Sequence, residues 1–178
     1  CALPILVDER ADKLDELWDV YTADKQKTGR SHRRGEQLNV GEYHLVTNGI
    51  IFNLAGQVLL QQRSFHKMSR PGLWTAEIGG SALVGETSQQ ALVRELSEEM
   101  NICVPAHQLR FLLTRRLSSW IEDWYAIKID SETMPIRLQA AEVIAADWLS
   151  LADALHVMQN NHQLTEANLI SKAATLLF

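Results

Sequence analysis

The hydrophobic and polar positions along the chain predict strands, then a helix, then more strands. Residues 43–53 are apolar and rich in β-branched side chains, which is typical of a buried strand. The turn sequence at 53–56 and the apolar run at 57–63 predict that the chain returns as the second strand of a hairpin. Shorter patterns of the same kind predict strands at 17–21, 74–78, 109–117, 120–129 and 143–149.

Residues 87–100 form the clearest predicted helix. Thr87 and Gln90 match a T-x-x-Q capping box at its start, and Asn101 can adopt the left-handed conformation that ends a helix. One side of this helix is apolar, through Leu92, Val93, Leu96 and Met100. Two further helices are predicted at 150–159 and 165–177. This order of elements predicts an α/β domain with a mixed sheet between helices.

Two polar segments, 21–41 and 64–73, are predicted to be loops. The first contains His32, Arg33 and Arg34, which suit either a lid or a dimer contact. We expect one domain over residues 1–178, in which 1–40 is a strand-and-loop extension and 41–178 is the core.

The composition excludes some classes of protein. With 178 residues, 46% of them hydrophobic and 22% charged, the chain can build one ordinary globular core. Its net charge of −5 disfavours a general nucleic-acid binder. The pair Cys1 and Cys103 makes no disulfide framework, no apolar run is long enough to span a membrane, and the start lacks the pattern of a signal peptide. We therefore expect a cytoplasmic protein without a membrane or nucleic-acid partner.

Candidate chemistry is concentrated on the predicted helix at 87–100. Glu95, Glu98 and Glu99 are spaced i, i+3 and i+4, so they share one helix face beside the apolar side. Like charges at this spacing repel one another, and a divalent cation among them would relieve the repulsion. Carboxylate oxygens on a rigid helix suit Mg²⁺ or Mn²⁺. The alternative interpretation is a solvated acidic helix face.

The surrounding residues resemble the Nudix box. The chain has Gly80, then Glu86 after five residues, then Arg94-Glu95-Leu96-x-Glu98-Glu99-x-x-Ile102 after seven more. One position departs from the family pattern, because Asn101 stands where the family usually has Gly. Asn is the next-best residue for a left-handed helix end, so the loop geometry is expected to be kept. The resemblance implies a Nudix-type α/β/α sandwich with a mixed β-sheet between helices.

The resemblance also implies roles for the residues of the box. Glu95, Glu98 and Glu99, with the Gly79 carbonyl, resemble the ligands of a Mg²⁺ or Mn²⁺ cofactor. Arg94 and Glu86 resemble the pair that holds the helix and its leading loop in register, with Gly80 and Asn101 as further structural support. The implied reaction is hydrolysis of a diphosphate by metal-activated water. A carboxylate takes the proton of that water, and Glu95 is a candidate because the general base varies within the family.

A second similarity is to isopentenyl diphosphate isomerase, a Nudix-fold enzyme that does not hydrolyse its substrate. The stretch 63–75 is similar to one in which the residues matching Arg63 and Lys67 contact the diphosphate, and His44 matches a metal ligand there. The isomerase needs a Cys just before the helix, where this chain has Gly79, and a His that Ser81 replaces. Arg63 and Lys67 still suit a hydrolase as cations facing a diphosphate, or they are ordinary surface charges.

Weaker candidates lie later in the chain. Glu122, Asp123 and Glu142 are candidates for a further carboxylate in the site, with Glu142 as a base or extra ligand near the substrate. Strand alternation places Glu122 and Asp123 on opposite sheet faces, so at most one of them faces the site. The alternative for each is a solvated surface charge. Trp120, Trp124 and Tyr43 are stacking or core residues, and Arg115–Arg116 is a weak candidate phosphate contact.

Three functions follow from these patterns. The first is a metal-dependent hydrolase that cuts a diphosphate linkage in a nucleoside diphosphate derivative or another small organic diphosphate. The second is an isomerase like the one above, and the third is a Nudix-fold module that binds a ligand without catalysis. The expected partner is a small-molecule diphosphate, with a homodimer as one possible assembly. Loops 21–41, 64–73 and 117–145 are expected to select the leaving group.

Overall fold

The computed structural model describes residues 15–178, so Cys1 lies outside the described residues. In chain order, the elements before the long central helix are β1 Leu17–Tyr21, β2 Lys27–Arg33, β3 His44–Asn53, β4 Val58–Arg63, β5 Trp74–Thr75 and β6 Ile78–Ser81. The remaining elements are α1 Ser88–Met100, a 3-10 turn at Ala106–Gln108, β7 Arg110–Arg116, β8 Trp120–Ile129, β9 Val143–Leu149, α2 Leu151–Asn160 and α3 Leu164–Leu177.

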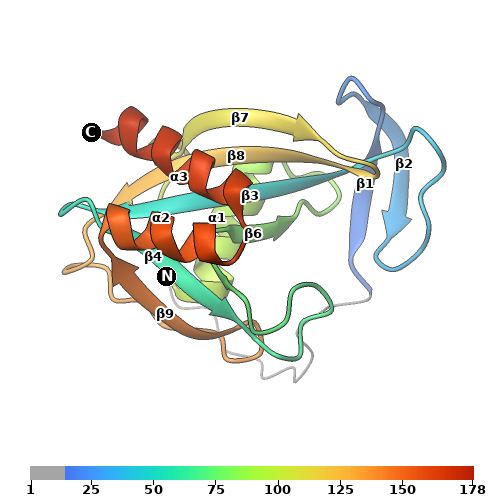
Figure 1. Cartoon of the computed structure of the whole chain (residues 1–178). Coiled ribbons are helices and arrows are strands. Elements are labelled where there is room, and N and C mark those ends of the chain that lie inside the picture. The colour runs from blue at the N-terminus through green and yellow to red at the C-terminus, as the bar shows by residue number, and fades with distance from the viewer. Residues whose placement is uncertain (1–14) are drawn as a thin grey trace.

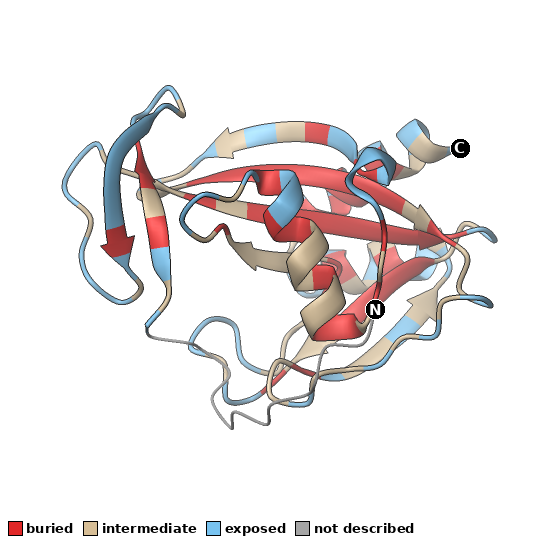
Figure 2. Ribbon diagram, turned by 180° about the vertical axis from the view of Figure 1, so that it is seen from behind, coloured by how far each residue is buried: buried red, intermediate tan, exposed pale blue. Residues whose placement is uncertain are grey.

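A mixed sheet lies between two helical layers, which confirms the predicted fold class. Helices α2 and α3 cover one face of the sheet, and α1 covers the other (Figures 1 and 2). Strands β3 and β8 are buried along almost their whole length because helices pack on both of their faces (Figure 2). None of the helices within residues 15–178 combines the length and apolar character needed to cross a bilayer.

Strand β3 organises the sheet because it pairs with three other strands. It runs parallel to β8 from His44 to Asn53, and its first half pairs antiparallel with β6. Only its far end pairs with β4, through Phe52 and Val58, so the predicted hairpin forms at the turn and nowhere beyond it. Strand β4 then diverges and pairs with β9. The divergence leaves room for β6 and for the cleft described below.

The predicted single strand at 74–78 is wrong, because the chain changes partner in the middle of it. Strand β5 pairs with β4, while β6 starts at Ile78 and pairs with β3. Between them, the backbone N–H of Ala76 donates to the carboxylate of Glu166 at 3.1 Å instead of joining a strand. Glu166, which takes the place of a strand partner for Ala76, is therefore 90 residues away in the sequence.

The predicted loop at 21–41 is also wrong over part of its length. Residues Lys27–Arg33 form β2, which pairs antiparallel with β1 in a separate hairpin at one end of the molecule (Figure 1). His32 is the one buried residue of β2. The hydrophobic pattern missed this strand because backbone pairing with β1, rather than side-chain burial, holds it. A bridge between Tyr21 and Tyr43 joins the hairpin to the start of β3.

Helix α1 begins and ends as predicted. The Thr87 hydroxyl accepts from the Gln90 backbone N–H at 3.2 Å, and the Gln90 side chain accepts from the Thr87 N–H at 2.9 Å. Asn101 has φ +57° and closes the helix in the left-handed conformation. The apolar side, through Leu92 and Leu96, is completely buried against the sheet. Local sequence and packing therefore specify the same helix.

We expect Thr87→Ala to lower the free energy of unfolding by about 1 kcal/mol, because it removes the hydroxyl that caps α1. Thr87→Ser keeps the hydroxyl and should remain within a few tenths of a kcal/mol of the parent protein. Urea unfolding followed by circular dichroism measures both values. An alanine variant as stable as the serine variant would show that the cap contributes nothing.

Candidate active site

A cleft of about 360 Å³ opens where β3 and β8 begin and where β6 ends. Helix α1, the 64–73 loop and the N-terminal hairpin form its other walls. From strand β3, His44, Val46 and Asn48 face the cleft, as alternate residues of a strand share one face. The cleft also brings together the candidate residues predicted from sequence, namely Gly79, Gly80, Glu95, Glu98, Glu99, Arg63, Lys67 and Glu142.

Arg94 joins the start of α1 to the loop before it. Its guanidinium donates to both carboxylate oxygens of Glu86, at 2.8 and 2.9 Å, and to the Ser81 carbonyl at 3.1 Å. Glu86 in turn accepts from the Leu83 backbone N–H at 2.8 Å. On its other side Arg94 donates to Glu95 at 2.8 Å. One side chain therefore fixes the position of the loop, the end of β6 and a cleft carboxylate.

Two glycines let β6 lie close to β3 and to a carboxylate of α1. A Cβ on Gly79 would overlap the carbonyl oxygen of Thr47, and Gly79 has φ +150°. A Cβ on Gly80 would lie 2.6 Å from Glu95 Oε1. Gly80 thus gives Glu95 its place against β6, and a side chain there would displace Glu95, whereas a side chain at Gly79 would push β6 away from β3.

Glu95 and Glu99 are two buried carboxylates of α1 whose environment disfavours their negative charge. Burial raises the pKa of Glu95 to about 7, against the lowering effect of Arg94, and the charges of Glu98 and Glu16 raise it further. Burial and the charges of Glu95 and Glu142 raise the pKa of Glu99 well above its usual range. Such a site gains stability from an added cation. Within residues 15–178, however, no three acidic, His or Cys side chains already stand close enough to hold a metal ion together.

The end of β4 and the 64–73 loop supply cations to the cleft. Lys67 forms an ion pair with Glu142, and Arg63 Nε donates to the Ser69 carbonyl at 3.1 Å. The predicted solvated surface charge is wrong for Glu142, because this ion pair lies in the cleft and its side chain is only 13% exposed. The cleft therefore brings the carboxylates of α1 near the cations at the end of β4 and in this loop, of which Lys67 is paired with Glu142.

Arg70 lies beside these cations and is held by carboxylates from two other segments. It pairs with Glu77 at 2.8 Å and with Glu166 of α3 at 3.1 Å. Glu166 is buried, and it also accepts from the Thr75 hydroxyl at 2.6 Å. Burial and the charge of Glu77 raise the pKa of the Glu166 carboxyl, although the hydrogen bond from Thr75 and the charge of Arg70 lower it. No local pattern predicted this network, because Glu166 joins it from α3, about 90 residues further along the chain.

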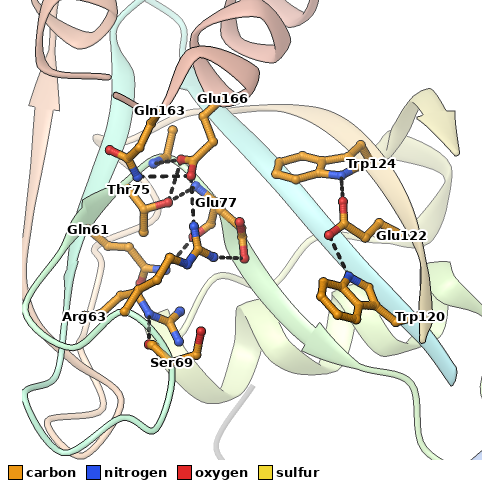
Figure 3. A network of polar contacts seen from close by, with 12 residues as sticks. Gln61, Arg63, Ser69, Thr75, Glu77, Trp120, Glu122, Trp124, Gln163 and Glu166 are labelled. Atoms are coloured by element: carbon orange, nitrogen blue, oxygen red, sulfur yellow. Dashed lines mark hydrogen bonds and ion pairs between the residues drawn. The ribbon is translucent and has the colours of Figure 1, made fainter. Parts of the chain in front are cut away.

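The start of β8 forms an aromatic wall of the cleft. Glu122 accepts from the indole N–H groups of Trp120 and Trp124, each at 2.8 Å (Figure 3), and from Arg115 at 2.8 Å. Trp120 lines the cleft, whereas Trp124 is buried in the core and cannot stack on a ligand. Arg115 is therefore engaged with Glu122.

Strand alternation correctly separated Glu122 from Asp123. Glu122 lines the cleft, while Asp123 accepts from the Thr114 hydroxyl at 2.6 Å and pairs with Lys25. The solvated alternative is wrong for both residues, since both are buried. Likewise Tyr43 lies under the guanidinium of Arg116, 5.9 Å from the ring centre, and does not line the cleft.

The N-terminal hairpin contributes residues that the sequence did not indicate. Trp18 of β1, with Glu16 and Arg34 beside the hairpin, lines the cleft. The Trp18 ring stacks on His44, with 4.4 Å between the ring centres. Burial and the charges of His32 and Arg34 lower the pKa of His44 to about 4, so its ring is neutral at pH 7. The only feature of the sequence that could have indicated this contribution is Trp18 itself, a large aromatic residue within the predicted strand 17–21.

Residues 42–172 match the family model for the NUDIX domain. The chain belongs to the NUDIX family. An uncharacterised Nudix hydrolase of Listeria monocytogenes is 38% identical over 135 residues, which are 76% of this chain and 80% of that protein. The isopentenyl-diphosphate Delta-isomerase of Escherichia coli is 26% identical over 118 residues, covering 64% of this chain and 65% of that protein.

Solved structures show the same fold. DR0079 from Deinococcus radiodurans superposes with a TM-score of 0.70 at 21% identity, over 89% of this chain and 99% of that one. The NUDIX domain of Shewanella oneidensis NrtR, solved with ADP ribose, gives a TM-score of 0.56 at 22% identity, over 76% of this chain and 89% of that one. Because the more similar relatives are named hydrolases, this Nudix protein is an enzyme acting on acid anhydrides.

We expect Gly79→Ala to lower the free energy of unfolding of this Nudix protein by about 1 to 3 kcal/mol or more, because the new Cβ meets the Thr47 backbone in a conformation that suits only glycine. Gly41→Ala is the matched control, since Gly41 also has a positive φ but faces open space. Thermal and urea unfolding measure the difference. Equal losses in the two variants would show that the close approach to β3 is unimportant.

The Arg94–Glu86 pair should give the Nudix fold a pH-dependent stability. Burial raises the pKa of Glu86, but the hydrogen bonds from Arg94 and Leu83 outweigh it, so the pKa lies below its ordinary 4.5. The stabilisation is therefore complete above pH 4.5 and is lost as pH falls through the lowered pKa. We expect Glu86→Gln to cost about 1 to 2 kcal/mol at pH 7.

The gap between parent and Glu86→Gln should narrow below pH 4.5. Urea unfolding at pH 7, 5 and 3.5 measures this gap. A gap that stays constant over this range would contradict a charged role for Glu86.

Proposed function

We propose that this Nudix enzyme hydrolyses a diphosphate linkage in a nucleoside diphosphate derivative or another small organic diphosphate, and that it needs Mg²⁺ or Mn²⁺. The observation that carries the proposal is the cleft itself, which the α1 carboxylates share with the cations Arg63 and Lys67. A bound divalent cation would balance the negative charge of the α1 carboxylates, and a bound diphosphate would balance the positive charge of Arg63 and Lys67.

The donor atoms that line the cleft fit a divalent cation once the α1 carboxylates draw closer together around it. Glu95, Glu98 and Glu99, with the Gly79 carbonyl, would hold it, because they are hard oxygen donors that face one cleft. Burial, and after it the charges of neighbouring carboxylates, raise the pKa values of Glu95 and Glu99, and a bound cation would offset both effects. Asn48 Oδ1, a buried oxygen of a cleft-lining residue, has no partner within residues 15–178 and adds to the oxygen-rich surroundings. When bound, the cation would neutralise phosphate charge and lower the pKa of water.

The protein's own residues would bind and orient the substrate. Arg63 and Lys67 would donate hydrogen bonds to phosphate oxygens and turn the phosphorus towards α1. Glu95 or Glu142 would accept the proton of the attacking water, since both carboxylates line the cleft. Arg94 would keep Glu95 in place without touching the substrate. The expected products are two phosphate monoesters, or a monoester and orthophosphate.

We expect Glu98→Gln to lower kcat at least about 100-fold, because it removes a carboxylate charge from the proposed cation site. Phosphate release is measured with Mg²⁺ from nucleotide sugars, nucleoside triphosphates, dinucleotides and isopentenyl diphosphate. Glu132→Gln is the matched control, since Glu132 is an exposed carboxylate outside the cleft. Circular dichroism establishes that both variants fold.

Each outcome of that experiment has a distinct meaning. Turnover that survives chelation of the metal, or that Glu98→Gln retains, would overturn the proposal. Tight binding of a compound without turnover would identify a ligand-binding module instead. Conversion of isopentenyl diphosphate to its isomer would identify the isomerase.

A further inference from the structure

The N-terminal hairpin, β1 with β2, lies outside the segment that matches the NUDIX family, yet it forms part of the cleft. The family match begins at residue 42, after both strands. Trp18, Glu16 and Arg34 nevertheless line the same cleft as the α1 carboxylates. Residues that the family does not define therefore face the substrate side of the proposed active site.

The hairpin acts on the cleft through His44. Trp18 is 7% exposed, and its ring stacks on His44 with an interplanar angle of 21°. The Arg34 guanidinium lies 5.8 Å from the Trp18 ring centre and pairs with Glu16 at 2.9 Å, which fixes the outer side of the stack. The neutral His44 ring is thereby held at the cleft wall by a residue from another part of the chain.

Trp120 completes the same wall from the next strand. His44 and Trp120 are register partners on β3 and β8, and their ring centres are 6.5 Å apart. Glu122 fixes the orientation of Trp120 by accepting from its indole N–H at 2.8 Å. This part of the cleft is therefore aromatic and held in place, whereas Arg63, Lys67 and the α1 carboxylates line other parts of the same cleft.

A buried polar atom in this wall also indicates a ligand. Trp18 Nε1 is buried without a hydrogen-bond partner within residues 15–178, and His44 Nδ1 is buried beside it, where the Ser119 backbone is a polar neighbour. An unsatisfied buried polar atom is unfavourable, so natural proteins rarely keep one without a function. A planar ring with its own donors and acceptors would supply stacking area and polar partners in one group.

We propose that the N-terminal hairpin is a specificity element of the active site, and that the wall it supports takes a planar heteroaromatic ring on the non-phosphate part of the substrate. His44 and Trp120 contact the ring. Trp18 and Glu122 are positioning residues that hold these two rings. The proposal rests on the proposed function, because it assumes that the substrate's diphosphate lies near α1 in the cleft.

Equilibrium binding tests this proposal without requiring turnover. The probes are α,β-methylene-ADP, which carries a ring, and methylenediphosphonate, which carries none, and neither can be hydrolysed at the bridge. Calorimetry with Mg²⁺ gives the ratio of their dissociation constants. Stacking of one base on an aromatic side chain should make the ring-bearing probe bind at least about fivefold tighter.

The variants separate positioning from folding. Trp120→Ala and Trp18→Ala should bring the ratio close to one while leaving methylenediphosphonate binding unchanged. Trp18→Phe should restore most of the ratio, because phenylalanine can still stack on His44. Trp148→Ala is the matched control, since Trp148 is a partly buried tryptophan that does not line the cleft. Glu122→Gln provides a second positioning variant if Trp18→Ala fails to fold.

A ratio near one in the parent protein would overturn the proposal, and so would a ratio that none of Trp18→Ala, Trp120→Ala and Glu122→Gln alters. These results are distinguishable from failure of the proposed function. A protein that does not hydrolyse any diphosphate still gives a binding ratio. If it does hydrolyse them, Trp18→Ala should raise KM for ring-bearing substrates more than it lowers kcat, which a purely structural defect would not do.

Discussion

The site depends on one guanidinium, that of Arg94. It binds the Glu86 carboxylate through two nitrogens and reaches the Ser81 carbonyl and Glu95 with the remaining donors. Burial disfavours its charge, but Glu86 and Glu95 more than offset this and raise its pKa. A planar fork with several fixed donors can join three backbone segments in this way, which the single ammonium of lysine cannot. The carboxylates of α1 are therefore held in place before any ligand arrives.

The parts of the site that sequence alone identified are those built from neighbouring residues. Thr87, Gln90 and Asn101 specify the ends of α1 by local hydrogen bonds, and the spacing of the glutamates follows from helix geometry. Strand alternation correctly placed Glu122 and Asp123 on opposite faces, although it left open whether they were buried. The long buried strands β3 and β8 were found because their hydrophobic patterns are strong.

The parts that sequence missed depend on partners far away in the chain. Strand β2 has almost no buried side chains, so its pairing with β1 leaves no hydrophobic pattern. The break between β5 and β6 depends on Glu166, and the stacking of Trp18 on His44 depends on how the hairpin folds over β3. Such contacts follow from topology rather than from spacing, and no local rule predicts them.

The contacts of Glu166 link two regions that lie on different sides of the sheet. The carboxylate belongs to the first turn of α3, yet it accepts hydrogen bonds from the Thr75 hydroxyl, the Ala76 backbone N–H and the Arg70 guanidinium. Any fluctuation that opens α3 therefore also releases the loop that carries the cleft cations. The order of the 64–73 loop thus depends in part on the docking of the C-terminal helix on the far face, together with the contacts of Lys67 and Arg63. Selection for a well-ordered site consequently acts on residues that never approach the substrate.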